Sequence, residues 1–439
     1  MLTFKTTTLL PVLLLALTLA GPGLSLRAGD DHGHAHDPFE PTLTREEGSF
    51  LAKVMTMTET DVNEAVRLLR EERPEKFKSA ALDFTLGNLL FQNDELTAAE
   101  SAYREAVAKM PRFRAALMNL GRILLMQNRT QETITLYQRL VEDGQANADI
   151  LLLLGHAILM EDAPVGAETA YRQALLLRPR DGEIRMGLAK ALLSQERYRE
   201  GLALIDEILE RDPLNQELWS LRVNAMLTDG DLERATRATE QARRLGRATP
   251  SMLASLGDLW LNQDRPIDAL DAYSEAFAGE KPSLDRLLRA TEGFLMVDDA
   301  EGAQTMIARA ESELEINDDP EARISLLRLK ADWAVREGQT DNAIALLRQV
   351  LERNPLDGRA LLTLTDLQAH EGHMEKALLT AERAARVEGY EAEALLRQAR
   401  IEVGRGHYAR AVPLLESAQA FDPRDAVSRY LEQVRRLSE

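Results

Sequence analysis

The amino-acid sequence predicts an all-α fold, an array of stacked helix pairs, and three observations support this prediction. Leu-Gly pairs recur every 34 residues, at Leu86-Gly87, Leu120-Gly121 and Leu154-Gly155. A tyrosine recurs at the same interval, at Tyr103, Tyr137 and Tyr171. Prolines stand near the ends of two of these units, at Pro111 and Pro179. A fixed period near this length is the signature of a repeat array, in which each unit buries its apolar face against its neighbours.

The composition fits a large folded chain and argues against two classes of partner. With 439 residues, 45% of them hydrophobic, the chain exceeds one ordinary domain and can fill an extended core. Its formal net charge of −19 repels nucleic acid and anionic lipid, so we expect neither as a partner. The chain has no cysteine, which excludes disulfides, cysteine–zinc sites and thiol catalysis.

Residues 1–20 have the pattern of an export signal. Lys5 supplies a positive charge, the run from Leu9 to Ala20 is mostly apolar, and small residues precede Gly21. A helix of that length would span about 18 Å, too little for a hydrocarbon layer of roughly 30 Å. We therefore expect cleavage after Ala20 and a mature protein that is secreted or periplasmic, without an integral membrane segment. An uncleaved signal anchor is the alternative.

Residues 21–44 are rich in Gly, Pro and Asp and poor in apolar residues, a composition typical of a flexible linker. The linker contains the tract DDHGHAHD, in which His32, His34 and His36 alternate with other residues. Imidazole groups bind Zn²⁺, Cu²⁺ and Ni²⁺, so this tract is a candidate metal site, with Zn²⁺ as the first ion to test. The alternative is a polar tether without a metal role.

The repeat register divides the rest of the chain. We expect residues 45–79 to form a degenerate N-terminal repeat or cap, because a terminal repeat has one face against water. About ten repeats follow over residues 80–425, with a small insertion at 318–323. Residues 424–439 are expected to form a capping helix whose inward residues are Val427, Leu431 and Val434.

This spacing resembles that of the tetratricopeptide repeat, whose pattern runs W-x2-L-G-x2-Y, then A-x3-F, then P. In the first repeat the resemblance is carried by Leu86-Gly87, Ala99, Tyr103 and Pro111. It covers residues 80–425 and implies a right-handed α-solenoid of antiparallel helix pairs. Small residues at the eighth and twentieth positions then let the two helices of a repeat approach, and the proline ends the second helix because its ring cannot continue it.

The resemblance also implies a concave groove, lined by the first helix of each repeat, in which peptides bind. Its polar candidates stand at the ninth position of each repeat. The first five are polar or basic, the next four are acidic and the last is basic: Asn88, Arg122, His156, Lys190, Asn224, Asp258, Glu292, Asp332, Asp366 and Arg400. Its apolar candidates are Phe84, Met118, Met126 and Met160. A peptide with acidic and apolar residues suits such a groove. The alternative is that the apolar residues pack between repeats and the charges form a solvated face.

No motif predicts an enzyme, and we expect no cofactor. His370-Glu371-Gly372-His373 is one residue short of the H-E-x-x-H pattern of zinc proteases, and Gly372 is expected in a turn. We therefore expect a non-enzymatic, exported scaffold that binds proteins or peptides and acts in the assembly or maintenance of an envelope complex. The alternative function is an exported metal-binding protein that uses the histidine tract.

Overall fold

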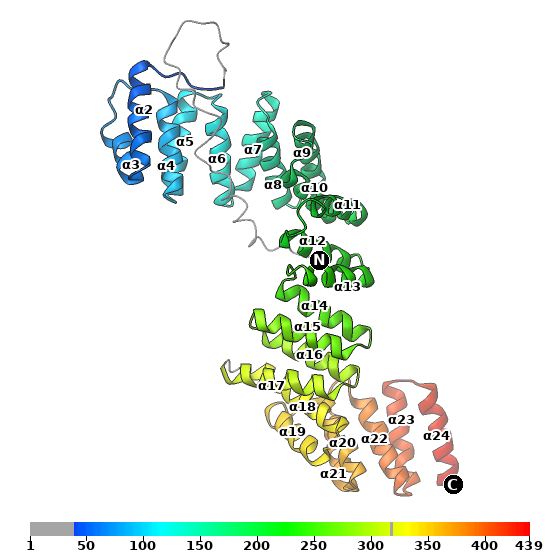
Figure 1. Cartoon of the computed structure of the whole chain (residues 1–439). Coiled ribbons are helices and arrows are strands. Elements are labelled where there is room, and N and C mark those ends of the chain that lie inside the picture. Colours follow the sequence, from blue (N-terminus) through cyan, green and yellow to red (C-terminus); the bar gives the residue numbers. More distant parts are fainter. Residues whose placement is uncertain (1–38, 317–318) are drawn as a thin grey trace. The chain divides into compact units, whose positions relative to one another are not determined.

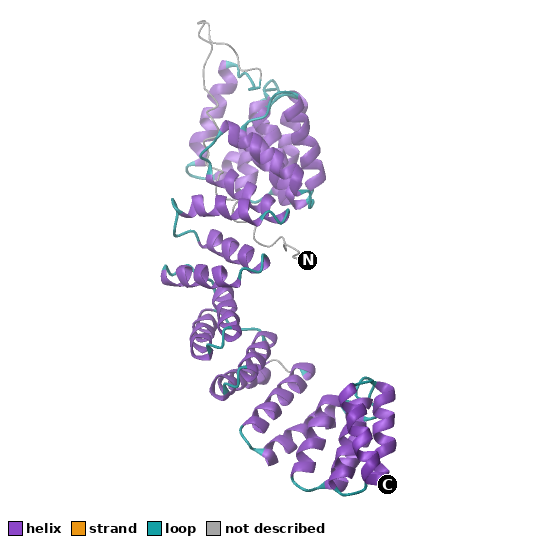
Figure 2. Ribbon diagram, turned by 90° about the vertical axis from the view of Figure 1, so that its right-hand side faces the viewer, coloured by secondary structure: helices purple, strands orange, loops and turns teal. Residues whose placement is uncertain are grey.

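The computed structural model describes residues 39–316 and 319–439, and these residues form helices joined by short turns, with no strand among them (Figure 1; Figure 2). The prediction of an all-α fold built from paired helices is confirmed. The signal peptide predicted at 1–20, most of the linker predicted at 21–44, and the candidate metal ligands His32, His34 and His36 lie outside the described residues.

The helices follow one another in pairs along the chain. Their bounds are α2 Arg45–Thr58, α3 Val62–Glu71, α4 Ala80–Gln92, α5 Leu96–Lys109, α6 Arg114–Met126, α7 Thr130–Glu142, α8 Ala148–Met160, α9 Pro164–Leu177, α10 Gly182–Ser194, α11 Tyr198–Leu209, α12 Gln216–Thr228, α13 Leu232–Arg244, α14 Pro250–Asn262, α15 Pro266–Gly279, α16 Leu284–Met296, α17 Ala300–Ile316, α18 Pro320–Arg336, α19 Thr340–Arg353, α20 Gly358–His370, α21 Met374–Ala384, α22 Glu391–Gly404, α23 Tyr408–Phe421 and α24 Asp425–Ser438. None of these helices, which cover the described part of the chain, is long and apolar enough to cross a membrane.

The chain consists of two compact units. The first unit contains the residues up to Leu218 together with Thr228–Gly230, and the second contains Trp219–Leu227 and Asp231–Glu439. Within the first unit, every helix from α2 to α10 packs against the helix that follows it. Within the second unit, the helices from α13 to α24 form a comparable stack.

Each repeat turns between its two helices at a residue whose backbone is left-handed. These ten residues have φ between 55° and 81°: Asp94, Asn128, Asp162, Glu196, Gly230, Asp264, Asp298, Gly338, Gly372 and Gly406. Successive members are 34 residues apart except for one step of 40 residues, from Asp298 to Gly338. The long step equals one period plus six residues, the size of the insertion predicted at 318–323.

The inserted residues that the structure describes lengthen a helix. Pro320 is the first residue of α18, and the side chain of Asp319 caps this helix by accepting hydrogen bonds from the backbone N–H groups of Glu321 and Ala322. Helices α17 and α18 each have 17 residues, whereas α14 and α16 have 13. Proline suits the first turn of a helix because the N–H that it lacks has no partner there.

The recurring glycine and tyrosine form the contact between the two helices of a repeat. A Cβ atom on Gly87 would lie 2.6 Å from the ring of Tyr103, and one on Gly257 would lie 2.7 Å from the ring of Tyr273. Both tyrosines are fully buried. Glycine is therefore required wherever this ring fills the space between the helices, since a buried ring in a packed core has no room to move.

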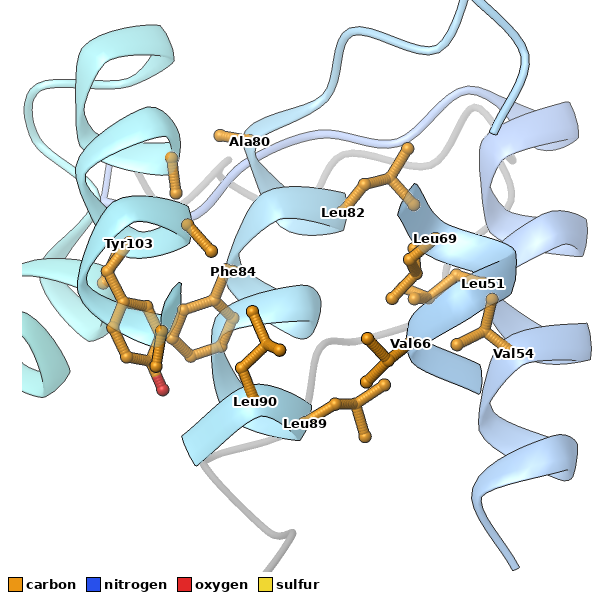
Figure 3. Close-up of a cluster of buried hydrophobic side chains, with 14 of the residues drawn as sticks. Leu51, Val54, Val66, Leu69, Ala80, Leu82, Phe84, Leu89, Leu90 and Tyr103 are labelled. Atoms are coloured by element: carbon orange, nitrogen blue, oxygen red, sulfur yellow. The ribbon is translucent and has the colours of Figure 1, made fainter. Parts of the chain in front are cut away.

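The N-terminal helices share one core with the first repeats (Figure 3). Leu51 of α2, Leu69 of α3 and Leu82 of α4 are buried together, and Phe84 faces Tyr103 with ring centroids 5.8 Å apart. Asp83 is also buried and forms ion pairs with Arg73 at 2.7 Å and Lys109 at 2.5 Å. A buried carboxylate is tolerated when it is paired in this way.

The chain ends in an amphipathic helix. The residues expected to face inward, Val427, Leu431 and Val434, are buried in α24, which packs against α23. The rest of α24 carries charged and polar residues that are largely exposed. A polar outer face of this kind suits the end of a repeat array, where the last apolar surface must be covered.

Candidate peptide-binding face

The ninth-position residues of the first unit lie one on each first helix of its repeats. Asn88 is on α4, Arg122 on α6, His156 on α8 and Lys190 on α10, and all four side chains are half-buried. Helix α8 contacts both α6 and α10, so Arg122, His156 and Lys190 stand on adjacent helices. We call the surface formed by these first helices in the first unit the first-helix face.

Asn88 already has partners within the fold. Its side-chain oxygen accepts hydrogen bonds from the hydroxyl of Tyr103 at 2.6 Å and from the amide of Asn119 at 3.0 Å. The tyrosine hydroxyl therefore reaches from the second helix of the repeat to the ninth position of its first helix. Asn88 serves mainly to satisfy this buried hydroxyl.

Arg122 makes no hydrogen bond or ion pair with the residues that the structure describes. Burial raises the pKa of Tyr137 and of Tyr103, and the charge of Arg122 opposes this rise in both cases. The guanidinium consequently lies close to two buried hydroxyl groups, and its charge also opposes the rise in the pKa of Glu183, with which it forms no direct ion pair. A half-buried, unpaired arginine is a ready donor for a carboxylate ligand.

His156 is a neutral group at physiological pH. Burial, and then the nearby charge of Lys190, lower its pKa to about 4. Its ring meets Tyr171 edge-on, with centroids 5.7 Å apart and an interplanar angle of 64°. The hydroxyl of Tyr171 is buried and has no hydrogen-bond partner among the described residues. The Tyr171 hydroxyl is therefore a buried polar atom left unsatisfied beside the His156 ring.

Lys190 is paired within the first unit. Its ammonium lies 2.7 Å from a carboxylate oxygen of Glu217, at the start of α12. The lysine side chain is 25% exposed and that of Glu217 is 47% exposed, so water reaches this pair. The net charge that the ninth-position row offers to a ligand therefore comes from Arg122.

The apolar candidates divide into core and surface. Phe84 is only 8% exposed and packs against Tyr103 and Phe113, so it belongs to the core between repeats and offers little area to a peptide. For Phe84 the structure favours the alternative of repeat packing. Met118, Met126 and Met160 are half-buried, which leaves part of each flexible thioether available for contact.

The acidic row of the second unit is largely neutralised by arginines of the following repeats. Asp258 pairs with Arg286 at 2.7 Å and also accepts a hydrogen bond from Tyr273. Asp332 pairs with Arg359 at 2.7 Å, and Asp366 pairs with Arg397 at 3.0 Å. Asn224 is exposed at the start of this unit. These ion pairs join successive first helices, so the acidic row acts within the fold.

A hollow of about 320 Å³ opens in the first unit, where α10 begins and α11 ends. Its lining includes three arginines and three apolar residues: Arg180, Arg185, Arg211, Met186, Ile208 and Leu218. Glu183 and Asp212 contribute two carboxylates. Sequence analysis did not select these arginines, because Arg180 and Arg211 lie in the turns between repeats and Arg185, in the first turn of α10, lies outside the ninth-position row.

The described residues contain no group of three or more His, Asp or Glu side chains placed to hold a metal ion. Gly372 lies in the turn between α20 and α21 with φ of 80°, and His373 lies 3.5 Å from Glu371 in the same turn. The two histidines beside it therefore do not share a helix face, which the H-E-x-x-H zinc site requires.

Models of the tetratricopeptide repeat family match residues 84–159, 159–225 and 334–389. The chain is 27% identical over 330 residues to "cellulose synthase operon protein C" of Xanthomonas axonopodis pv. citri (strain 306), an alignment that covers 72% of this chain and 19% of that protein. It is 30% identical over 111 residues to "BBSome complex member BBS4" of Bos taurus, covering 25% of this chain and 21% of that protein. The chain thus spans about a fifth of the length of these relatives.

Among solved structures, the chain is similar to a tetratricopeptide repeat protein from Parabacteroides merdae. The TM-score is 0.43 at 17% sequence identity, and the match covers 57% of this chain and 97% of that one.

Proposed function

Because this chain is a tetratricopeptide repeat protein, we propose that it is a non-enzymatic scaffold that binds other proteins through the first-helix face of its first unit. A stack of helix pairs presents a long surface of side chains from consecutive first helices, and repeat arrays use such surfaces for binding. The residues on that surface, and not the fold, select the partner.

The observation that carries this proposal is that Arg122 lacks an ion-pair partner among the described residues, whereas three aspartates at the same repeat position in the second unit are paired. In the second unit Asp258, Asp332 and Asp366 each have an arginine partner. In the first unit Arg122 has none among the described residues, and it stands on the helix next to His156. Charged groups without an internal partner are available to steer and orient a ligand of opposite sign.

The test is partner capture with a matched pair of arginine variants. The tagged chain is crosslinked in its own cells, and the captured proteins and linked residues are identified by mass spectrometry. Arg122→Gln is compared with Arg199→Gln, since Arg199 is an exposed arginine without a partner on the second helix α11. We expect one dominant partner, linked to the first-helix face, whose capture falls with Arg122→Gln only. Links confined to neighbouring repeats, or equal capture by both variants, would refute the proposal.

We further propose that the scaffold is exported and acts in the assembly or maintenance of an envelope complex. The support is the export pattern of residues 1–20, together with the similarity to a protein named for the cellulose synthase operon. Cell fractionation and N-terminal sequencing of the mature chain test the first part. A mature protein that begins at Gly21 outside the cytoplasm is the expected result, and an intact N-terminus in the cytoplasm would contradict it.

The histidine tract supplies the competing function of metal binding, which a titration separates from the scaffold. Zn²⁺ is titrated into the full chain and into a variant in which His32, His34 and His36 are alanine. A partner that is captured equally well by the triple variant supports the scaffold. If the triple variant loses both partner capture and zinc binding, the histidine tract is the functional segment.

A further inference from the structure

The hollow at the start of α10 combines free arginines with an apolar floor. Arg180 and Arg211 are exposed, and their guanidinium groups form no hydrogen bond or ion pair with the described residues. Both belong to the first unit, as does the whole lining of the hollow. In a chain of net charge −19, two unpaired arginines that face one hollow stand out, because most arginines near them have acidic partners.

The third arginine of the hollow is held in place. The guanidinium of Arg185 donates to the carbonyl oxygen of Pro179 at 2.9 Å and pairs with Glu207 at 3.2 Å. Its side chain is 16% exposed, so it forms a fixed wall. The free donors are therefore those of Arg180 and Arg211.

The acidic residues of the hollow offset the charge of its two free arginines. The lining holds three arginines against two carboxylates, Glu183 and Asp212. One carboxylate oxygen of Asp212 accepts a hydrogen bond from the amide of Asn215 at 3.2 Å. Because Arg185 is already paired with Glu207, two free arginines face two carboxylates, and the rim has no excess charge. The unused N–H donors of Arg180 and Arg211 still suit a carboxylate better than a neutral or cationic group.

The floor of the hollow is apolar. Leu218 is buried, and Met186 and Ile208 are half-buried beside it. The volume of about 320 Å³ lies at the small end of the range for pockets that hold a discrete ligand group. An aliphatic side chain fits such a floor, and burying it there removes apolar area from water.

We propose that this hollow, which we call the arginine hollow, anchors an acidic peptide segment of the partner in which an aliphatic residue stands next to a glutamate or aspartate. The aliphatic side chain packs on Met186, Ile208 and Leu218, and the neighbouring carboxylate bridges Arg180 and Arg211. The planar guanidinium matches a carboxylate in two parallel hydrogen bonds. Glu183 and Met186 lie on α10, which also carries Lys190 of the first-helix face, so the anchor continues that face toward the turns. The assignment rests on the proposed scaffold function and names the chemistry of its ligand.

The probe is a blocked tetrapeptide of alternating leucine and glutamate, and its counterpart with glutamine in place of glutamate. Both are titrated into the full chain labelled on isoleucine and methionine methyl groups, and the NMR shifts of Ile208 and Met186 report binding. We expect saturable shifts with the glutamate peptide and an affinity at least about tenfold lower for the glutamine peptide, the ratio that one charged hydrogen bond supplies.

Two variants locate the site. Arg180→Gln with Arg211→Gln should weaken binding of the glutamate peptide by about tenfold or more, whereas Arg199→Gln should leave it unchanged. Unchanged melting temperatures of all variants show that each remains folded. Equal shifts with both peptides, absence of shifts at millimolar concentration, or full competition by inorganic phosphate would overturn the proposal; the last result would indicate a simple anion site.

Partner capture distinguishes this proposal from the scaffold function. If capture is lost with Arg122→Gln but survives in the double arginine variant, the scaffold stands and the arginine hollow is not its anchor. If the peptide binds the hollow but no partner is captured in cells, the anchor stands and the scaffold function fails.

Discussion

Exchanging glycine for alanine at two helical positions should change stability in opposite directions. Gly155 lies on α8, where a Cβ atom would stand 2.7 Å, 2.8 Å and 2.9 Å from three carbons of the Tyr171 ring. That ring is fully buried, and a Cβ atom on Gly187 of α10 would approach it to 2.5 Å. Gly48 lies inside α2, and a Cβ atom there would have no atom within 4 Å.

The magnitudes follow from two competing terms. Alanine favours a helix over glycine by about 1 kcal/mol, which applies at both positions. Forcing an extra carbon into a packed core costs typically 1–3 kcal/mol, and about 2 kcal/mol is reasonable where the ring is confined from two sides. We therefore expect Gly155→Ala to destabilise its repeat by about 1 kcal/mol and Gly48→Ala to stabilise its helix by up to about 1 kcal/mol.

Hydrogen exchange followed by mass spectrometry measures both effects locally, which matters because a repeat array does not unfold as one unit. Amides of α8 to α10 should exchange about fivefold faster in Gly155→Ala, and those of α2 about fivefold slower in Gly48→Ala. Slower exchange in Gly155→Ala would refute the role of the ring contact. In a Tyr171→Leu background the clash is removed, so the effect of Gly155→Ala should change sign.

Three further predictions concern the turn residues, a buried carboxylate and a histidine. Asp162→Gly should raise the melting temperature by relieving about 1 kcal/mol of left-handed backbone strain at φ of 55°, whereas Gly338→Ala, at φ of 67°, should lower it. Asp83→Asn should destabilise the N-terminal core by about 2 kcal/mol in urea unfolding followed by circular dichroism, because Arg73 and Lys109, whose side chains are 18% and 28% exposed, lose their shared carboxylate. The pKa of His156 is about 4 in the folded chain, against 6.5 ordinarily, so the unfolded chain binds a proton first as the pH falls. The free energy of unfolding should therefore be constant above pH 6.5, decrease by up to ~3 kcal/mol toward pH 4, and stay constant below that. His156→Gln should flatten that decline, and an unchanged pH profile would show that the imidazole is not buried.

The fold could be predicted from the sequence because the same pattern of small and large residues recurs in successive repeats. The pairing of Gly87 with Tyr103 recurs at Gly155 with Tyr171, and in each case a small residue and a large ring fill one space. A single occurrence would be ambiguous, but a fixed period allows only a stack. Four of the ten left-handed turn residues are glycines, and four of the others are aspartates, residue types that accept this backbone more readily than most.

The candidate site was less predictable, because its properties depend on neighbours in other repeats. Glutamate at position 217 neutralises Lys190, and Arg286 neutralises Asp258, although each pair is separated by more than 25 residues in the sequence. Position within a repeat shows which way a side chain points, and it does not show which partner the next repeat supplies. Phe84 illustrates the same gap: it stands at an expected groove position but is covered by Phe113, the residue that precedes α6.

The ion pairs show that charged residues at equivalent helix positions either join neighbouring repeats or stay available for a ligand. In the second unit, carboxylates and arginines of consecutive first helices pair at 2.7–3.0 Å and join one repeat to the next. A ligand would have to break such a pair before using either group, and leaving one charge of a pair unsatisfied is costly. In the first unit Arg122, Arg180 and Arg211 carry no such cost, because none of them has a partner to lose among the described residues. An acidic segment can therefore use these three arginines without breaking an existing ion pair.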